Sequence, residues 1–274
     1  MLAGLKFFVE GLLRKTGFFG KIVIVLYKKF RFVCDSVKFE TAWALKGGEI
    51  KNINAFERWV YSQNGEDGII QAIFRQIGTT NRFFAEFGVE DGKQCSSRLL
   101  KERGWSGLMM DASDNSPASG VKKEFITAEN INRLFKKYRV PKEFDLLGID
   151  LDGNDYWVWK AIRHSPRVVV IEYNAGFAPD ESRVIKYNQK FVWDKTHYFG
   201  ASLLALAKLG REKGYTLVGC DNNGVNAFFV RSDLVKGNFK VNGIERLYRP
   251  FRHGKMINGV RIAQPLSNKK FLEV

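Results

Sequence analysis

The segment from Phe83 to Ser113 reads FFAEFGVEDGKQCSSRLLKERGWSGLMMDAS. Its first apolar run carries the carboxylate Glu86 and stops at Gly88, and its second apolar run ends on Asp111. Apolar runs that do not alternate with polar residues are typical of strands buried on both faces. A glycine-containing turn and a helical stretch lie between the two runs, so the segment predicts a strand–helix–strand unit with parallel strands.

The same alternation continues along the chain. We expect further strands at 124–127, 144–153, 167–174, 215–221 and 226–233, and helices at 128–138, 155–162 and 202–214. A helix precedes the first strand, because Ile69, Ile73 and Ile77 recur at helical spacing before Gly78. Only a short turn separates the last two strands, which is typical of an antiparallel hairpin. The sequence therefore predicts a doubly wound α/β fold with a mostly parallel sheet and one antiparallel strand near the end.

Basic segments flank this region. We divide the chain into a helical or irregular extension (1–55), a central domain (56–233) and an irregular tail (234–274). The first 32 residues mix Phe and Leu with Lys and Arg, and their longest apolar run, residues 22–27, is far short of the ~20 residues that span a bilayer. Two interpretations are open: a helix lying on an anionic membrane surface, or an amphipathic helix packed on the domain or a partner.

The net charge of +15 indicates an anionic partner, which is nucleic acid, phospholipid, or an acidic or nucleotide-linked substrate. The three cysteines, Cys34, Cys95 and Cys220, are widely spaced and form no metal-binding pattern. Unpaired thiols are typical of a reducing compartment. We therefore expect a cytoplasmic protein, with peripheral contact at the inner membrane face as one option.

Acids follow four of the expected strands, at the sheet edge where open α/β folds bind ligands. The turn after the first strand also carries Glu90 and Asp91, which disfavour a pyrophosphate at the following helix. S-adenosylmethionine has a positive sulfonium and no phosphate, and an acid such as Asp111 can accept hydrogen bonds from its ribose hydroxyls. We therefore infer that S-adenosylmethionine is the cofactor. Glycines allow close backbone approach in such a turn. The expected cofactor-binding residues here are Glu86, Gly88, Glu90, Gly92, Asp111 and Asp150.

Six stretches, YSQNGEDGII, FFAEFGVEDG, GWSGLMMDAS, LLGIDLDGNDYWVW, VVVIEYN and HYFGASLLALAKLGREKGYTLVGCDNNGVNAFFVR, span about residues 61–231. This series resembles the motifs of FkbM-type class I S-adenosylmethionine-dependent methyltransferases. The resemblance implies a Rossmann-like sheet of seven strands with a reversed last strand, and O-methylation, often of sugar hydroxyls. It also implies that Glu86 and Gly88 form the methyl-donor motif, that Asp111 is the ribose acid, and that Gln63 and Glu66 lie near the methionine end of the donor. The turn departs from the family at Glu90, where a glycine is often found.

Two catalytic schemes are open. In the first, Asp150, Asp152, Glu172 and Asn174 hold Mg²⁺ or Mn²⁺, an arrangement similar to catechol-type methyltransferases, and the ion lowers the pKa of a bound hydroxyl. The competing interpretation is that Asp152 and Asp155 cap the helix that follows them. In the second scheme, without a metal, His197 is the general base. The catalytic candidates are therefore Asp152, Glu172 and His197.

The favoured function is O-methylation of a glycan, a glycolipid precursor or another small hydroxyl substrate. An exposed aromatic residue among Tyr156, Trp157 and Trp159 could stack on a sugar face. RNA methylation is the second enzymatic candidate, because the positive charge suits phosphate binding. Against it, DLDGND is acidic where a flipped base needs an apolar stack. A non-catalytic scaffold that keeps the fold is the third candidate.

Overall fold

The computed structural model describes residue 30 and residues 33–113 and 120–274. Seven strands form one sheet in the order β3-β2-β1-β4-β5-β8-β7. Their bounds, in chain order, are β1 (Phe83–Phe87), β2 (Ser106–Asp111), β3 (Lys122–Lys123), β4 (Leu146–Ile149), β5 (Val168–Glu172), β7 (Tyr215–Cys220) and β8 (Asn226–Arg231). The first five run parallel, and β8 runs antiparallel to both of its neighbours. This is the Rossmann-like sheet of the class I methyltransferase fold, so the predicted fold is confirmed.

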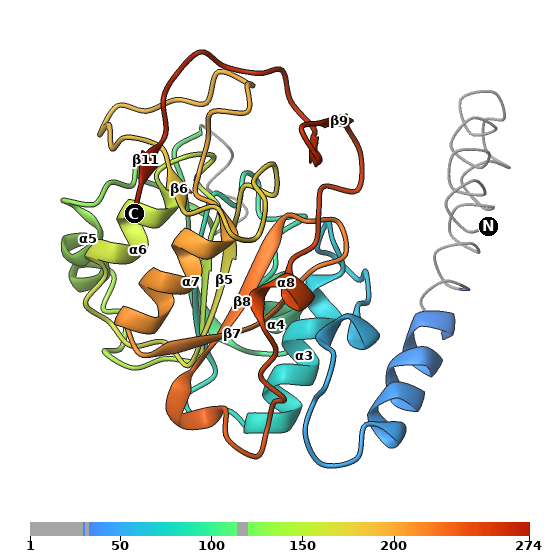
Figure 1. Ribbon diagram of the computed structural model, residues 1–274. Coiled ribbons are helices and arrows are strands. Elements are labelled where there is room, and N and C mark those ends of the chain that lie inside the picture. The colour runs from blue at the N-terminus through green and yellow to red at the C-terminus, as the bar shows by residue number, and fades with distance from the viewer. Residues whose placement is uncertain (1–29, 31–32, 114–119) are drawn as a thin grey trace, which may run out of the picture.

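Helices cover both faces of the sheet (Figure 1). One face packs against α5 (Ile131–Lys137), α6 (Asp155–Ala161) and α7 (Leu203–Glu212), and the other against α3 (Glu66–Ile77), α4 (Arg98–Glu102), the 3₁₀-helix η1 (Ile53–Phe56) and a helix over 33–45. In β5, Val169 and Ile171 join the first core, and Val168 and Val170 join the second. Since successive strand residues point to opposite faces, two cores require an apolar residue at every position.

The structure corrects the expected strand at 124–127. The strand beside β2 is the two-residue β3, and residues 124–127 form no strand. Thr127 and Asn130 instead hydrogen-bond each other's backbone N–H groups at the start of α5, over 2.9 and 3.2 Å. This reciprocal capping starts the helix and ends the extended chain. The predicted helix before β1 begins at Glu66, with Gly65 as its N-cap.

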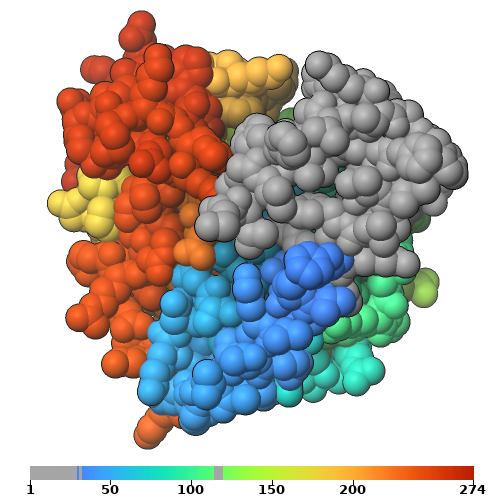
Figure 2. Space-filling view, turned by 90° about the vertical axis from the view of Figure 1, so that its right-hand side faces the viewer, coloured from blue at the N-terminus to red at the C-terminus, as the bar shows by residue number. Residues whose placement is uncertain are grey.

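Both flanking segments pack onto the central sheet. The Ile50 N–H donates to the Asn238 carbonyl and the Lys240 N–H to the Ile50 carbonyl, over 2.8 and 2.9 Å. Figure 2 shows the two segments side by side, blue and orange-red. The tail, which we expected to be irregular, contains α8 (Ile244–Leu247), the hairpin of β9 (Lys255–Ile257) and β10 (Val260–Ile262), and β11 (Leu272–Glu273), which pairs with β6 (Arg183–Val184). The three-way division of the chain stays a prediction.

The membrane-surface helix predicted near the N-terminus falls mainly on residues 1–29, which lie outside the described residues. Within the described ranges, no helix is long and apolar enough to cross a bilayer.

Candidate active site

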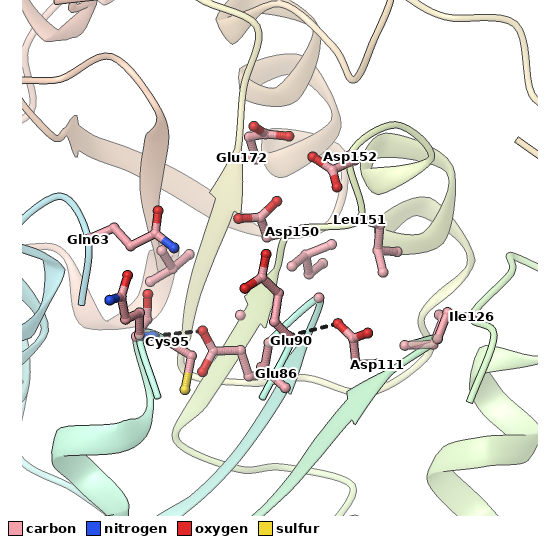
Figure 3. A pocket seen from close by; sticks show the side chains of 18 of the residues that line it. Gln63, Glu86, Glu90, Cys95, Asp111, Ile126, Asp150, Leu151, Asp152 and Glu172 are labelled. Carbon is pink, nitrogen blue, oxygen red and sulfur yellow. Dashed lines mark hydrogen bonds between the residues drawn. The ribbon is translucent and has the colours of Figure 1, made fainter. Parts of the chain in front are cut away.

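A cavity of about 890 Å³ lies at the carboxyl ends of β1, β2, β4 and β5. Figure 3 shows side chains from the loops after these strands gathered around it. It lies where a doubly wound sheet binds its ligand, at the edge predicted from the sequence. Cavities of this size accept small-molecule ligands of several hundred Å³.

The Glu86 carboxylate organises the turn after β1. Glu86 pairs in register with Gly148 of β4, where an added Cβ would lie 2.7 Å from the Glu86 Cγ. Glycine at 148 therefore leaves room for this side chain inside the sheet. The two Glu86 oxygens accept hydrogen bonds from the Ser96 and Ser97 N–H groups, over 2.9 and 2.7 Å. Burial raises the pKa of Glu86, and these hydrogen bonds oppose that rise.

Gly88 is required by packing. Its φ is +69°, and a Cβ there would lie only 1.4 Å from the Asp150 carbonyl oxygen. Gly88 lines the cavity, so the expected close approach to a ligand stays a prediction, and the contact with the loop after β4 is a second reason for glycine here. Gly88 thus joins the ends of β1 and β4 and fixes the position of Asp150.

The Asp111 carboxylate lies at the end of β2 and lines the cavity. It accepts hydrogen bonds from the Glu90 N–H and the Ser113 N–H, each over 2.8 Å. Glu90 adopts a φ of +49°, which turns its N–H toward Asp111. Gly92, at φ +72°, lets the turn pass Val121, whose nearest atom would lie 3.3 Å from an added Cβ. The two hydrogen bonds fix the orientation of the Asp111 carboxylate, which faces the cavity (Figure 3).

Gln63 and Glu66 lie on the side of the cavity formed by the start of α3. Glu66 is 3% exposed and accepts hydrogen bonds from the Asn64 N–H and the Asn226 amide, both over 2.7 Å. Burial raises its pKa. Sequence reasoning missed Asn64 and Asn226, although Asn226 begins a strand next to β5 at the ligand-binding edge.

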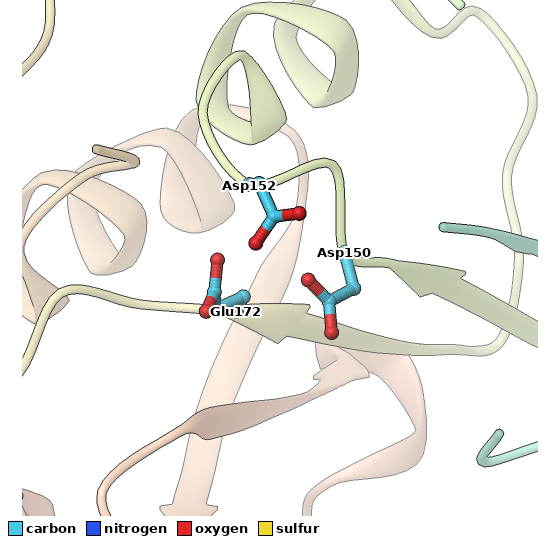
Figure 4. A group of neighbouring side chains, drawn as sticks. All are labelled: Asp150, Asp152 and Glu172. Carbon is cyan, nitrogen blue, oxygen red and sulfur yellow. The ribbon is translucent and has the colours of Figure 1, made fainter. Parts of the chain in front are cut away.

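Three acids converge after β4 and β5. One oxygen from each of Asp150, Asp152 and Glu172 lies within 4.8 Å of the others, and Figure 4 shows the carboxylates directed toward one another. The pKa values of Asp150 and Glu172 are raised well above their ordinary values, first by burial and then by the neighbouring carboxylates. Such crowding of like charges favours either protonation or a bound cation.

The structure does not support the helix-capping interpretation: the N-cap of α6 is Asn154, which makes no side-chain capping hydrogen bond, and Asp155 instead holds the turn before the helix. Its buried carboxylate accepts hydrogen bonds from the Leu151 and Gly153 N–H groups, over 2.7 and 2.9 Å, and burial raises its pKa to about 6. Asp152, at φ +52°, is exposed and lines the cavity. The structure therefore separates the two acids into one that supports the turn and one that faces the ligand space.

Glu172 and Asn154 line the same cavity, and each carries one buried side-chain oxygen of interest. Glu172 Oε2 and Asn154 Oδ1 have no hydrogen-bond partner within the described part of the chain. The other amide atom of Asn154 donates to the Asn188 carbonyl over 2.8 Å, which fixes the side chain. Buried oxygens without a partner are costly, and they are the groups that a bound cation or donor would satisfy.

The structure does not bring Asn174 to the acid cluster. Its amide nitrogen donates to the His197 and Phe199 carbonyls, and its oxygen accepts from the Gly176 N–H. Asn174 is fully buried and does not line the cavity. It supports the loop after β5, whereas Asn154, in the turn after β4, does line the cavity.

His197 also lies away from the cavity lining. It is 8% exposed, its ring packs against Phe177 and Phe271, and burial lowers its pKa. This placement gives no support to the predicted role of His197 as general base, because a base must reach the reacting hydroxyl.

The aromatic residues at the cavity are not those considered from the sequence. Tyr156 and Trp159 are buried, Trp157 donates to the Ile185 carbonyl, and none of the three lines the cavity. Phe191 and Trp193 line it instead. They come from the long segment between β5 and α7, whose path no periodicity reveals.

The charge of the cavity opposes that of the chain. Among its described lining residues are nine carboxylates and one lysine, Lys93, whose Nζ pairs with Asp91 over 2.5 Å. The nine are Glu66, Glu86, Glu90, Asp91, Asp111, Glu124, Asp150, Asp152 and Glu172. On a chain of net charge +15, this local excess of acid favours a neutral or cationic ligand.

No family model matches the chain, and no curated protein matches it. Among solved structures it is similar to TnmH (13% identity, TM-score 0.36), over 55% of this chain and 50% of that one. It is also similar to the N-terminal domain of EvdMO1 with SAH bound (12%, 0.38), over 62% and 80% of the two chains. A third similar structure is an S-adenosylmethionine-dependent methyltransferase from Clostridium acetobutylicum, with 10% identity and a TM-score of 0.34. The similarity covers 61% of this chain and 92% of that one. The chain thus spans half the length of TnmH, and the assignment of the fold rests on the strand order.

Proposed function

We propose that this chain is an S-adenosylmethionine-dependent O-methyltransferase. The observation that carries the proposal is the acid-lined cavity at the carboxyl edge of a methyltransferase-type sheet. A dinucleotide would bring a pyrophosphate against these carboxylates, with only the already paired Lys93 to offset it. A sulfonium cofactor carries positive charge and no phosphate, so its charge complements that of the cavity.

The residues present fit this cofactor, which supplies an electrophilic methyl group when bound. Asp111 would accept the ribose hydroxyls, and the Glu90 and Ser113 N–H groups hold it in place for this role. Gln63 and Glu66, with Asn226, offer amide and carboxylate groups for the polar methionine end. Glu86 would support the turn after β1 and would not bind the cofactor itself, because its two oxygens accept hydrogen bonds from the Ser96 and Ser97 N–H groups.

We propose further that Asp150, Asp152 and Glu172 face the acceptor and hold a divalent cation, with Asn154 as a neutral ligand. The convergence of the three acids and the unpartnered oxygens of Glu172 and Asn154 support this. Mg²⁺ and Mn²⁺ prefer such oxygen ligands. An alcohol is a poor nucleophile until its proton is removed or polarised, and the acid cluster is the group in this cavity that can serve that step.

The proposed acceptor is a sugar hydroxyl of a glycan or glycolipid precursor. Phe191 and Trp193 at the cavity supply aromatic faces that suit a sugar ring. The acidic lining disfavours RNA, because a phosphate backbone would meet carboxylates at the entrance.

Calorimetry with S-adenosylmethionine, S-adenosylhomocysteine and NAD tests the cofactor. We expect binding of the first two and none of NAD; binding of NAD alone would overturn the proposal. Titration with Mn²⁺ tests the cation: Glu172→Gln should lose binding, whereas the matched control Asp91→Asn, which removes a carboxylate outside the cluster, should retain it. Equal binding by both variants would exclude the metal site.

A further inference from the structure

A second, smaller cavity of about 220 Å³ lies on the opposite flank of β8, against the edge strand β7. It is formed where η1, β7 and α8 meet, three elements from distant parts of the sequence (Figure 1). Three cations line it, Lys51, Arg246 and Arg249, and no carboxylate does so among the described residues. Its charge is therefore opposite to that of the candidate active site.

The cavity is built on an irregularity of the sheet. The pairing of β7 with β8 shifts register between Leu217 and Gly219, and both Val218 and Gly219 line the cavity. An added Cβ at Gly219 would lie 2.5 Å from the Ile53 side chain, so glycine allows η1 to pack directly on the strand. Bulges of this kind bend an edge strand and are frequent beside binding sites.

Hydrogen bonds fix the Arg249 side chain and the backbone at Lys51. Arg249 donates to the carbonyls of Arg246 and Tyr248, over 2.8 and 2.9 Å, and to Asn54 Oδ1 over 3.0 Å. The pairing of Ile50 with the 238–240 segment brings Lys51 next to Asn242, whose amide lies 3.5 Å from the Lys51 carbonyl. The backbone segments that carry the three cations, from two distant parts of the chain, are thus joined around one cavity, and the Arg249 guanidinium is held in place there.

None of the three cations forms an ion pair within the described part of the chain. Glu57 is the acid that is hydrogen-bonded to Asn54. It accepts hydrogen bonds from the Asn54 amide over 2.9 Å and from the Asn222 N–H and amide over 2.6 and 2.8 Å. Glu57 lies behind Asn54 and does not line the cavity. No ion pair within the described residues therefore offsets these three like charges, and an anion bound in the cavity would lower their mutual repulsion.

We propose that this cavity binds a phosphate group. The arginine and lysine side chains, with the Asn52 amide beside them, provide the charge-assisted donors that phosphate oxygens accept. The volume is smaller than that of sites for drug-sized molecules, which suits a single charged group with the rest of its carrier outside. The phosphate comes either from a small phosphomonoester or from a phospholipid head group at a membrane surface. This inference does not depend on the proposed methyl transfer.

The test uses the full-length variant Lys51→Glu/Arg246→Glu. Both side chains are exposed, so we expect the variant to fold, which thermal unfolding by circular dichroism verifies. The matched control is Lys136→Glu/Lys160→Glu, which makes the same charge change on α5 and α6, at exposed residues outside both cavities.

Calorimetry with inorganic phosphate and co-sedimentation with phosphatidylglycerol vesicles distinguish the two sources. Loss of two charged contacts should weaken binding by at least about tenfold relative to the control. A selective loss for inorganic phosphate supports the small-ligand source, and a selective loss for vesicles alone supports the lipid head group. If the variant and the control bind both probes equally, the cavity is not a phosphate site.

Discussion

Replacing Gly88 with alanine should destabilise the protein by about 3–6 kcal/mol. A positive φ costs a non-glycine residue about 1–2 kcal/mol. The new Cβ would lie 1.4 Å from the Asp150 carbonyl oxygen, so the ends of β1 and β4 must separate, which resembles overpacking of a core at about 1–3 kcal/mol. The same movement strains the 3.1 Å hydrogen bond from the Gly88 N–H to the Met110 carbonyl, worth about 1 kcal/mol.

Urea denaturation of Gly88→Ala and Gly104→Ala measures the steric contribution. Gly104 also has a positive φ, +80°, but a Cβ there meets no atom within 4 Å. Its substitution should therefore cost only the backbone preference, about 1–2 kcal/mol. Equal free energies of unfolding for the two variants would show that contact with Asp150 does not set the need for glycine at position 88.

The other expectations concern the ligand, the acids, pH and the N-terminus. Asp111→Asn should weaken S-adenosylmethionine binding by about 1.5–3 kcal/mol in calorimetry, and an unchanged affinity would place the ribose elsewhere. Glu172→Gln should abolish turnover with donor affinity nearly unchanged, as measured by rates with a sugar acceptor and by calorimetry; a parallel loss of donor affinity would contradict an acceptor-side role. Burial lowers the pKa of His197 from its ordinary value of 6.5. As the pH drops below 6.5, the unfolded chain therefore binds a proton at His197 more readily than the folded chain does, and the free energy of unfolding should fall. His197→Phe should flatten this decline in denaturation curves, and an unchanged curve would assign the decline to other groups. Removal of residues 1–29 should reduce co-sedimentation with anionic vesicles, and equal sedimentation of both forms would argue against membrane contact.

Much of the fold could be predicted because the sheet has two cores. Val168 to Ile171 are all apolar since alternate residues face opposite helix layers, and such runs mark central strands directly. The reversed strand was predictable from the short turn before Asn226. The strand at Lys122–Lys123 was not, because two lysines carry no apolar signal and pair only through their backbones.

The site was predictable where it follows from strand ends and not where it depends on long loops. Asp111, Asp150 and Glu172 end parallel strands, so their meeting at one sheet edge follows from the topology. The segment between β5 and α7 carries His197 inward and Trp193 to the cavity, and its path is set by pairing with the C-terminal strand β11. Asn154 could have been found, since it shares the turn of Asp150 and Asp152.

Both outer edges of the seven-stranded sheet are unsuited to adding a strand from another molecule. At one edge, β3 is two residues long, and both are exposed lysines that would repel a like copy. At the other edge, η1 packs on the end of β7, where Ile53 contacts Gly219 and the Asn54 amide donates to the Cys220 carbonyl over 2.7 Å. Short, charged or covered edges are the means by which sheet proteins avoid aggregation through backbone pairing. The N-terminal extension that carries η1 therefore protects against aggregation, and its loss should lower the solubility of the folded protein.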